Sequence, residues 1–183
     1  MLEINFGNFP SIETERLMLR QIVEADVNDI FMLRSDEEAM KYIDRPRTKT
    51  SEEALELINK FHDLYEKNEA ITWAICYRED AKLIGNIGIW NFDKPNYRAE
   101  LGYMLKPSFH RLGIMNEAMK PVINYGFNQL NLHSLQANIN PLNEASKSVL
   151  LKNNFVKEAY FKENYFYNDK FLDSMIFSLV NPS

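Results

Sequence analysis

Hydrophobic residues recur along the chain with two different periods, and this alternation predicts a mixed α/β fold. A period of two, with strand-forming residues between turn signals, predicts strands over residues 14–20, 71–78, 83–90, 98–105, 133–139, 155–167 and 170–179. A period of three to four predicts helices over residues 25–34, 51–67, 114–130 and 143–153. The second of these has a clear start, because the Thr50 hydroxyl can accept from the free amides of the first turn and Glu52 and Glu53 complement the helix dipole.

The order of these elements indicates how the sheet is built. Residues 71–105 read as three consecutive strands of an antiparallel meander, and a strand–loop–helix–strand–helix segment follows. No internal repeat or linker-like segment interrupts the chain, and 183 residues fit one domain. We therefore expect a single domain over residues 1–183, with its core over about 12–180.

Composition narrows the class of protein. Hydrophobic residues make up 45% and charged residues 26%, a globular balance. Cys76 is the single cysteine, so no internal disulfide can form, and three scattered histidines offer no metal-ligand spacing. The net charge of −5 argues against a nucleic-acid ligand, and we see neither a signal peptide nor an apolar run of roughly 20 residues. We expect a cytoplasmic monomer or homodimer without metal, nucleic-acid or membrane partners.

The loop that leads into the helix at Ile114 is the first candidate site. The start of a helix points unpaired amides outward at the positive end of its dipole, and a glycine such as Gly113 lets a phosphate approach the backbone. His110 and Arg111 add donors or positive charge beside it. A plain helix entry, in which Gly113 only makes the turn, explains the local pattern as well.

Four stretches in register resemble one known family. They are Glu13-Thr-Glu-Arg-Leu-Met-Leu-Arg20, Leu83-Ile-Gly-Asn-Ile-Gly-Ile89, Ala99-Glu-Leu-Gly-Tyr103, and His110-Arg-Leu-Gly-Ile-Met-Asn-Glu-Ala118 preceded by Pro107-Ser-Phe109. Together they resemble the GNAT superfamily of acetyltransferases, and within it the RimJ/RimL-type branch that acetylates the N-termini of ribosomal proteins. The resemblance implies a twisted, mostly antiparallel sheet of about seven strands, flanked by about four helices, with a V-shaped splay between the central strands near Tyr103 and His133.

The resemblance also implies acetyl-coenzyme A as the co-substrate, without a metal. The residues that it implies for binding are Tyr103, Met104, Leu105, His110, Arg111, Leu112, Gly113, Ile114, Met115, Asn116, Asn138, Asn143 and Ser146. Three positions of the loop depart from the family pattern, since His110 stands where the family has glutamine or arginine, Arg111 replaces a usual glycine, and Met115 replaces a second small residue. Met115 is expected to narrow the approach to the helix start, which keeps a catalytically weak coenzyme-A-binding module as an alternative.

Asn143 and Ser146 lie at the start of the last predicted helix. Taken alone, Asn143 is a helix N-cap and Ser146 a third-position donor. By resemblance, the asparagine contacts the pantetheine arm. Many members of the family protonate the leaving thiolate with a tyrosine at the position of Leu150, and leucine cannot do so. The RimJ/RimL-type branch uses the serine instead, which points to Ser146.

Glu100 is a carboxylate within an otherwise apolar strand. By alternation it shares a face with Arg98 and Gly102, so it either contacts Arg98 on a solvated face or accepts the proton of an acceptor amine. The strand end at residues 103–105 would, by resemblance, pair with pantetheine and stabilise the tetrahedral oxyanion. The implied reaction is direct attack of a primary amine on the thioester.

The acceptor stays open at this stage. A protein N-terminal α-amine is one candidate, and a small amine such as a polyamine or an aminoglycoside-type drug is the other. A series of aromatic residues near the C-terminus could line the acceptor site or a dimer contact, or could pack between strands: Tyr160, Phe161, Tyr165, Phe166, Tyr167 and Phe171.

Overall fold

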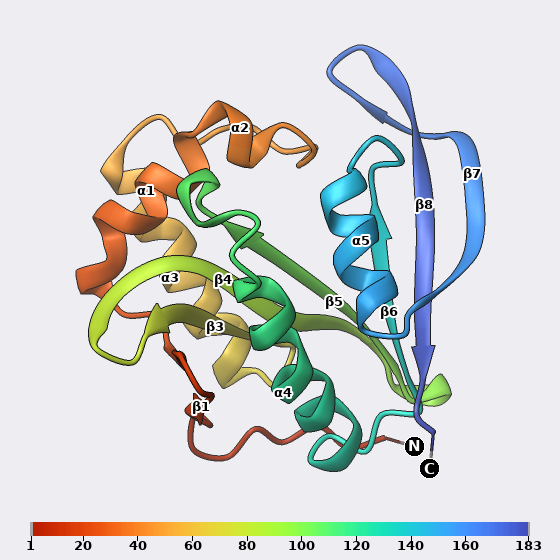
Figure 1. The fold of residues 1–183 in the computed structure, drawn as a ribbon, viewed down its shortest axis with the longest axis horizontal. Helices are drawn as coiled ribbons and strands as arrows, with labels where there is room; N and C mark the ends of the chain where they lie inside the picture. Colours follow the sequence, from red (N-terminus) through yellow and green to blue (C-terminus); the bar gives the residue numbers. More distant parts are fainter. Residues whose placement is uncertain (1, 183) are drawn as a thin grey trace.

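The structure is a computed structural model that describes residues 2–182, in which eight strands form one sheet covered by five α-helices (Figure 1). The strands are β1 (Ile12–Glu13), β2 (Leu17–Gln21), β3 (Ala70–Tyr77), β4 (Asp80–Asp93), β5 (Arg98–Leu105), β6 (Ser134–Ile139), β7 (Val156–Tyr167) and β8 (Lys170–Val180). The helices are α1 (Val27–Ser35), α2 (Glu37–Met40), α3 (Ser51–Glu66), α4 (Ile114–Asn128) and α5 (Glu144–Lys152). The sheet order is β1-β2-β3-β4-β5-β6-β8-β7, and only β5 and β6 are parallel neighbours. None of the helices within residues 2–182 has the length and apolarity that a membrane crossing requires.

The expected mixed, mostly antiparallel architecture is confirmed, with one more strand and one more helix than the sequence predicted. The added strand, β1, forms a hairpin with β2 because Thr14 makes a turn, its Oγ1 accepting from the Leu17 amide at 2.9 Å. The added helix, α2, is only one turn long and begins after Asp36, whose carboxylate accepts from the Ala39 amide at 2.7 Å. Thr50 caps α3 as predicted, and β5 has the predicted bounds.

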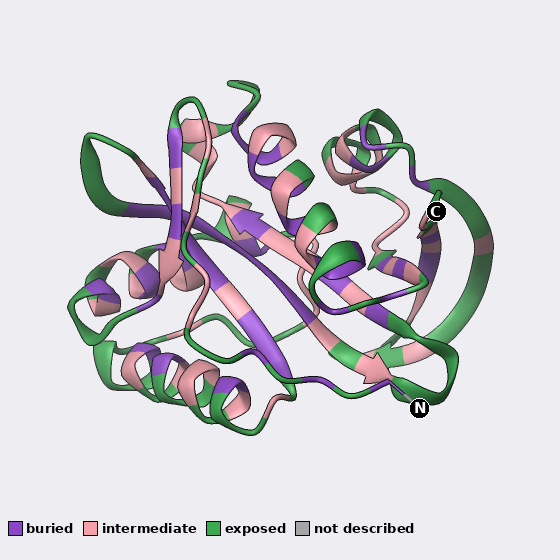
Figure 2. Cartoon of the chain, turned by 90° about the horizontal axis from the view of Figure 1, so that it is seen from below, coloured by how far each residue is buried: buried purple, intermediate pink, exposed green. Residues whose placement is uncertain are grey.

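The two faces of the sheet bury separate hydrophobic clusters, and this fixes which side chains share a face. Leu101 of β5 lies in the cluster that α4 covers, whereas Met104 packs with α1 and α3 on the other face. The buried positions run along the central strands, and β7 at the edge of the sheet is largely exposed (Figure 2). We call the face that carries Met104 the α1 face and the opposite one the α4 face.

The splay between central strands is present, but its position differs from the prediction. The parallel pairing covers residues 98–100 of β5 and 134–136 of β6, and the strands separate after Glu100 and Gln136. They are therefore paired next to His133 and apart at Tyr103. Because the strands are parallel, their C-terminal ends diverge together. We call this region the β5–β6 divergence.

The aromatic residues near the C-terminus are largely exposed, although some of them contact each other or the neighbouring strand across the β7–β8 hairpin. Tyr160, Phe161, Phe166 and Phe171 keep 48%, 48%, 59% and 65% of their surface exposed. The Phe166 and Phe171 rings pack edge to face with centroids 5.1 Å apart, and the Tyr160 hydroxyl hydrogen-bonds Asp173 of β8. Tyr165 reaches beyond the hairpin, because its hydroxyl hydrogen-bonds the carboxylate of Asp44 in the segment between α2 and α3.

Candidate active site

The loop between β5 and α4 has a strained backbone that explains its glycine. Gly113 has φ +78° and Arg111 has φ +62°, in the left-handed region that side chains disfavour. A Cβ on Gly113 would meet only Arg16 Nη2, at 3.5 Å, so conformation and not space requires glycine here. Arg111 stands where the family pattern has a glycine, and its positive φ is the physical reason for that pattern.

The amides at this loop are free to bind a ligand. Within residues 2–182, no acceptor lies within hydrogen-bonding distance of the backbone amides of residues 111–116, and the first bond of α4 is Glu117 N to Gly113 O. Met115 is 7% exposed and Ile114 1%, because both side chains enter the core. The expectation that Met115 narrows the approach to the helix start is therefore wrong. The arrangement fits an anionic group such as a diphosphate.

A polar network ties this loop to the hairpin at the start of the chain. The Glu117 carboxylate accepts from Thr14 Oγ1 at 2.6 Å, from the Arg16 amide at 2.8 Å and from Arg16 Nε at 2.7 Å. Arg16 also donates from Nη1 to the Leu112 carbonyl, at 3.1 Å. Sequence reasoning noted Arg16 and Glu117 only as parts of separate motifs. Their contact shows why the two motifs occur together.

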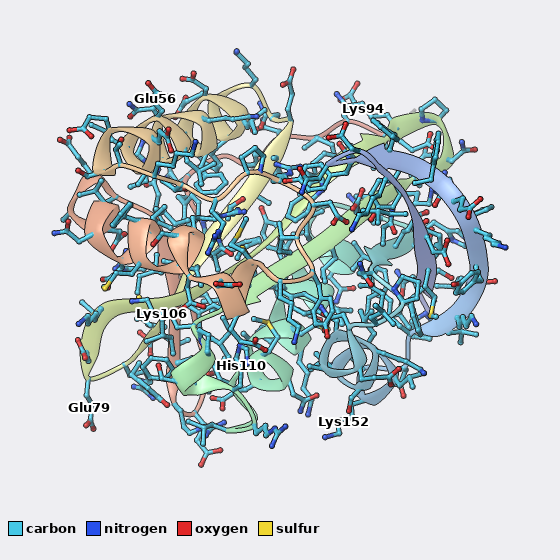
Figure 3. The ribbon with its side chains drawn as sticks, turned by 90° about the horizontal axis from the view of Figure 1, so that it is seen from above. Glu56, Glu79, Lys94, Lys106, His110 and Lys152 are labelled. Atoms are coloured by element: carbon cyan, nitrogen blue, oxygen red, sulfur yellow. The ribbon has the colours of Figure 1, made fainter. Side chains whose placement is uncertain are left out.

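Two of the predicted binding side chains are already engaged within the protein. His110 Nε2 donates to the Leu105 carbonyl at 2.9 Å, which leaves that carbonyl less available to a ligand. Asn116 Oδ1 accepts from Asn153 Nδ2 at 2.9 Å and so joins α4 to the end of α5. Figure 3 shows His110 near the end of β5 marked by Lys106, whose ammonium pairs with Asp29 of α1 at 2.7 Å. Asn116 therefore offers the loop site its free backbone amide, while its side-chain oxygen is engaged by Asn153.

Tyr103, Asn143 and Ser146 come together across the β5–β6 divergence. The Tyr103 hydroxyl donates to the Ser146 carbonyl at 3.3 Å, and Asn143 Oδ1 accepts from the Ser146 amide at 3.0 Å. Burial raises the pKa of Tyr103 to about 12, so the phenol stays protonated at neutral pH. The N-cap role of Asn143 is confirmed, and the backbone of Ser146 is held without use of its hydroxyl.

Glu100 lies at the closed end of the same divergence, on the α1 face. Its carboxylate accepts from Asn91 Nδ2 at 2.9 Å, while Arg98 pairs with Asp93 at 3.0 Å. The alternative of an Arg98–Glu100 contact is therefore wrong. The Trp90 ring crosses β5 beside Glu100, at Gly102, where a Cβ would lie 2.3 Å from the indole.

The predicted residues thus divide between the two faces of the sheet. Tyr103 packs against the cluster that α4 covers, whereas Glu100 shares the α1 face with Met104. Asn138 alternates with buried Ala137 on β6, so its side chain lies on the α1 face and away from Ser146. A molecule held by α4 and α5 and another on the α1 face would meet at the divergence.

A catalytic cysteine and a metal site both have little support among the described side chains. Cys76 is fully buried in β3, and burial raises its pKa to about 11, so it is a poor nucleophile. Within residues 2–182, no group of three or more histidine, cysteine, aspartate or glutamate side chains is placed to hold a metal ion.

The Glu117 network predicts a pH-dependent contribution to stability. Burial by itself raises the pKa of Glu117, but the hydrogen bonds from Thr14 and Arg16 outweigh it and hold the pKa below its usual value. A carboxylate with a lowered pKa stabilises the fold above the unfolded-state pKa of about 4.3, and this is lost as pH falls through the native pKa. Glu117→Gln should lower the free energy of unfolding by about 1 kcal/mol at pH 7, and the difference should shrink below pH 4.

Urea denaturation of both proteins between pH 3.5 and 7 measures this difference. Glu144→Gln is the matched control, because Glu144 is 73% exposed and pairs only with Lys147, at 3.4 Å. A Glu117→Gln penalty that is the same at both ends of the pH range would contradict the assignment.

Comparison with known proteins identifies the fold and the reaction. The model of the acetyltransferase (GNAT) domain matches residues 16–156. The N-acetyltransferase YoaA of Bacillus subtilis (strain 168) is 36% identical over 174 residues, which cover 95% of this chain and 98% of the relative. The [ribosomal protein uS5]-alanine N-acetyltransferase of Escherichia coli (strain K12) is 26% identical over 129 residues, which cover 70% of this chain and 65% of the relative.

Solved structures of acetyltransferases superpose on almost the whole chain. The ribosomal-protein-S5-alanine acetyltransferase of Vibrio fischeri superposes with a TM-score of 0.82 at 26% identity, covering 95% of this chain and 98% of that one. RimL, a ribosomal L7/L12 α-N-protein acetyltransferase in complex with coenzyme A, superposes with a TM-score of 0.84 at 20% identity, covering 93% and 98%. The loop, the divergence and the matched family model lead to one conclusion: this chain belongs to the GNAT acetyltransferase family, whose members transfer an acetyl group from acetyl-coenzyme A to an amine.

Proposed function

We propose that this acetyltransferase modifies the N-terminal α-amine of a peptide or protein. The observation that carries the proposal is Glu100, a carboxylate at the closed end of the β5–β6 divergence, on the face opposite Tyr103 and Ser146. Its neighbour Arg98 is paired elsewhere, so the carboxylate is available to accept a proton. The name of the uS5-alanine N-acetyltransferase among the relatives supports the same acceptor.

The acidity of amines also favours an α-amine. Attack on the thioester requires a neutral amine, and the ordinary pKa is about 7.7–8.0 for an α-amine and about 10.4 for lysine. Roughly a tenth of an α-amine is neutral at pH 7, against well under a thousandth of a lysine side chain. A lysine acetylase must therefore supply roughly 3.5 kcal/mol more through desolvation or a stronger base. Glu100 is the one base that we assign to this site.

We assign the binding of acetyl-coenzyme A to the α4 side of the sheet. The amides of residues 111–116 would hold the diphosphate. The unpaired edge of residues 103–105 would bind the pantetheine arm, except for the Leu105 carbonyl, which already accepts a hydrogen bond from His110. Asn143 and Ser146 border the same space from α5. The bound thioester supplies the electrophilic acetyl group, and Ser146 Oγ assists the leaving thiolate. A single reduced cysteine suits a cytoplasmic enzyme.

The acceptor assignment predicts a specific pattern of substrates. Amidated peptides with a free N-terminus should be acetylated there, in preference to N-blocked lysine peptides and polyamines, as measured by thiol release and mass spectrometry. Glu100→Gln keeps an acceptor for Asn91 Nδ2 but loses the base, so kcat/KM should fall by about 10²–10⁴, most strongly at low pH. The matched control is Glu158→Gln, because Glu158 contacts only Ser178.

Exclusive modification of lysine side chains or of a small polyamine would overturn the peptide assignment and leave the acetyltransferase intact. Unchanged kcat/KM in Glu100→Gln across pH would remove Glu100 as the base.

Ser146 can be tested separately, because its backbone bonds do not need the hydroxyl. Ser146→Ala should lower kcat by about ten- to a hundredfold, while the dissociation constant for coenzyme A changes by less than about twofold. Ser148→Ala, at an exposed serine on the same helix, should leave both quantities at wild-type values. Equal losses of turnover and affinity in Ser146→Ala would mean a binding contact only.

Arg16 is expected to position the loop that holds the diphosphate. Arg16→Met removes the donor to the Leu112 carbonyl and the ion pair to Glu117, so the loop loses its support from the β1–β2 hairpin. The dissociation constant for coenzyme A, measured by calorimetry, should rise about tenfold. Arg78→Met is the control, because Arg78 is 51% exposed and pairs only with Glu13, at 3.4 Å. Wild-type affinity in Arg16→Met would show that the hairpin does not support the site.

A further inference from the structure

Arg34 on α1 is a half-buried cation without an ion-pair partner among residues 2–182. Within residues 2–182 its Nε atom is buried without any hydrogen-bond partner, and no ion pair involves this guanidinium. Burial, followed by repulsion from Arg45, lowers the pKa of Arg34 to about 10, so the group is still charged at pH 7. Buried charges are costly unless an opposite charge accompanies them. An anionic group of a ligand can therefore serve as the counter-ion that Arg34 lacks.

The segment that passes Arg34 does not supply this counter-ion. Residues 41–49 carry four cations and a single acid, Asp44, in a chain whose net charge is −5. Asp44 is engaged by the Tyr165 hydroxyl of β7, whereas the backbone amide of Thr48 donates to the Arg34 carbonyl at 3.1 Å. Arg45 is exposed and forms no ion pair within residues 2–182. Arg34 and Arg45 are close enough for like-charge repulsion, and neither forms an ion pair within residues 2–182.

This cationic pair borders the face on which we place the acceptor. Ile30, one turn before Arg34 on the same side of α1, packs in one cluster with Met104 of β5. Met104 shares the α1 face with Glu100, four residues earlier on the strand, which corresponds to about 13 Å. The Asp44–Tyr165 contact joins the segment of residues 41–49, which follows α1 and α2, to β7.

We propose that Arg34, together with Arg45, binds an acidic side chain of the acceptor, and that the enzyme prefers peptides with an aspartate or glutamate within about their first five residues. This inference rests on the proposed N-terminal acceptor. An extended peptide advances about 3.3 Å per residue, so an amine beside Glu100 places its first few side chains along α1. The acceptor carboxylate then provides the counter-ion that the fold lacks, as a charge-assisted and often bidentate pair.

Peptides that differ by one charge test this preference. Amidated hexapeptides begin with a free serine, contain alanine elsewhere, and carry glutamate or glutamine in turn at positions 2, 3, 4 and 5. At one position or more, the glutamate peptide should have a kcat/KM at least about tenfold higher than its glutamine partner, mainly through KM. In Arg34→Met this ratio should fall to about one, and Arg34→Lys should recover part of it.

A matched variant separates recognition of the acceptor carboxylate by Arg34 from a general effect of positive charge in this segment. Arg47→Met should keep the wild-type ratio, because Arg47 belongs to the same segment but is 53% exposed and faces Glu37 at 3.6 Å. Equal rates for glutamate and glutamine peptides at all four positions would overturn the inference and leave the N-terminal acceptor standing. Equal loss on both peptides in Arg34→Met, with a lower Tm, would assign Arg34 a structural role and overturn it as well. If no peptide is acetylated but small amines are, the proposed acceptor fails and this inference fails with it.

Discussion

Strands β5 and β6 are parallel neighbours that pair over residues 98–100 and 134–136 and then separate. Beyond that point the facing edges present backbone N–H and C=O groups without a strand partner, and such groups need another partner when water is displaced. An extended ligand with its own amides, such as the pantetheine arm proposed to bind here, would satisfy them. The same separation lets Tyr103 reach α5 on one face while Glu100 stays on the other. The position of each proposed catalytic group follows from where the pairing ends.

The loop before α4 depends on residues that are a hundred positions away. Its two left-handed residues, Arg111 and Gly113, adopt a conformation that costs roughly 1–2 kcal/mol at a residue other than glycine. Contacts from Arg16 to the Leu112 carbonyl and to Glu117 hold this conformation in place without a ligand. A loop that is ordered before binding pays less conformational entropy when the ligand arrives. The β1–β2 hairpin is therefore expected to contribute to affinity for the cofactor through its support of the loop.

Features that depend only on neighbouring residues, such as the bounds of a strand or the cap of a helix, could be predicted from the sequence. The bounds of β5 followed from alternation, and the start of α3 followed from the Thr50 cap. Long-range pairings could not be read in this way. The contact of Arg16 with Glu117 joins residues 101 positions apart, and that of Tyr103 with the Ser146 carbonyl joins residues 43 positions apart, so no periodicity encodes them. The inward direction of Met115 could have been found, since it lies with Ala118 and Met119 on one face of α4.

The distribution of charge matters more for this enzyme than its net charge. A net charge of −5 suggests a preference for cationic amines, yet an attacking amine must be neutral, and a site that stabilises the ammonium form would work against the reaction. Arg34 and Arg45 instead concentrate positive charge beside α1, where neither forms an ion pair within residues 2–182, and this suits an anionic group of the acceptor rather than its amine. Free helix amides and Arg111 likewise give the α4 side a local positive potential that suits phosphates. We infer that both substrates are drawn in by anionic groups remote from the reacting atoms, while the amine itself reaches Glu100 in its reactive form.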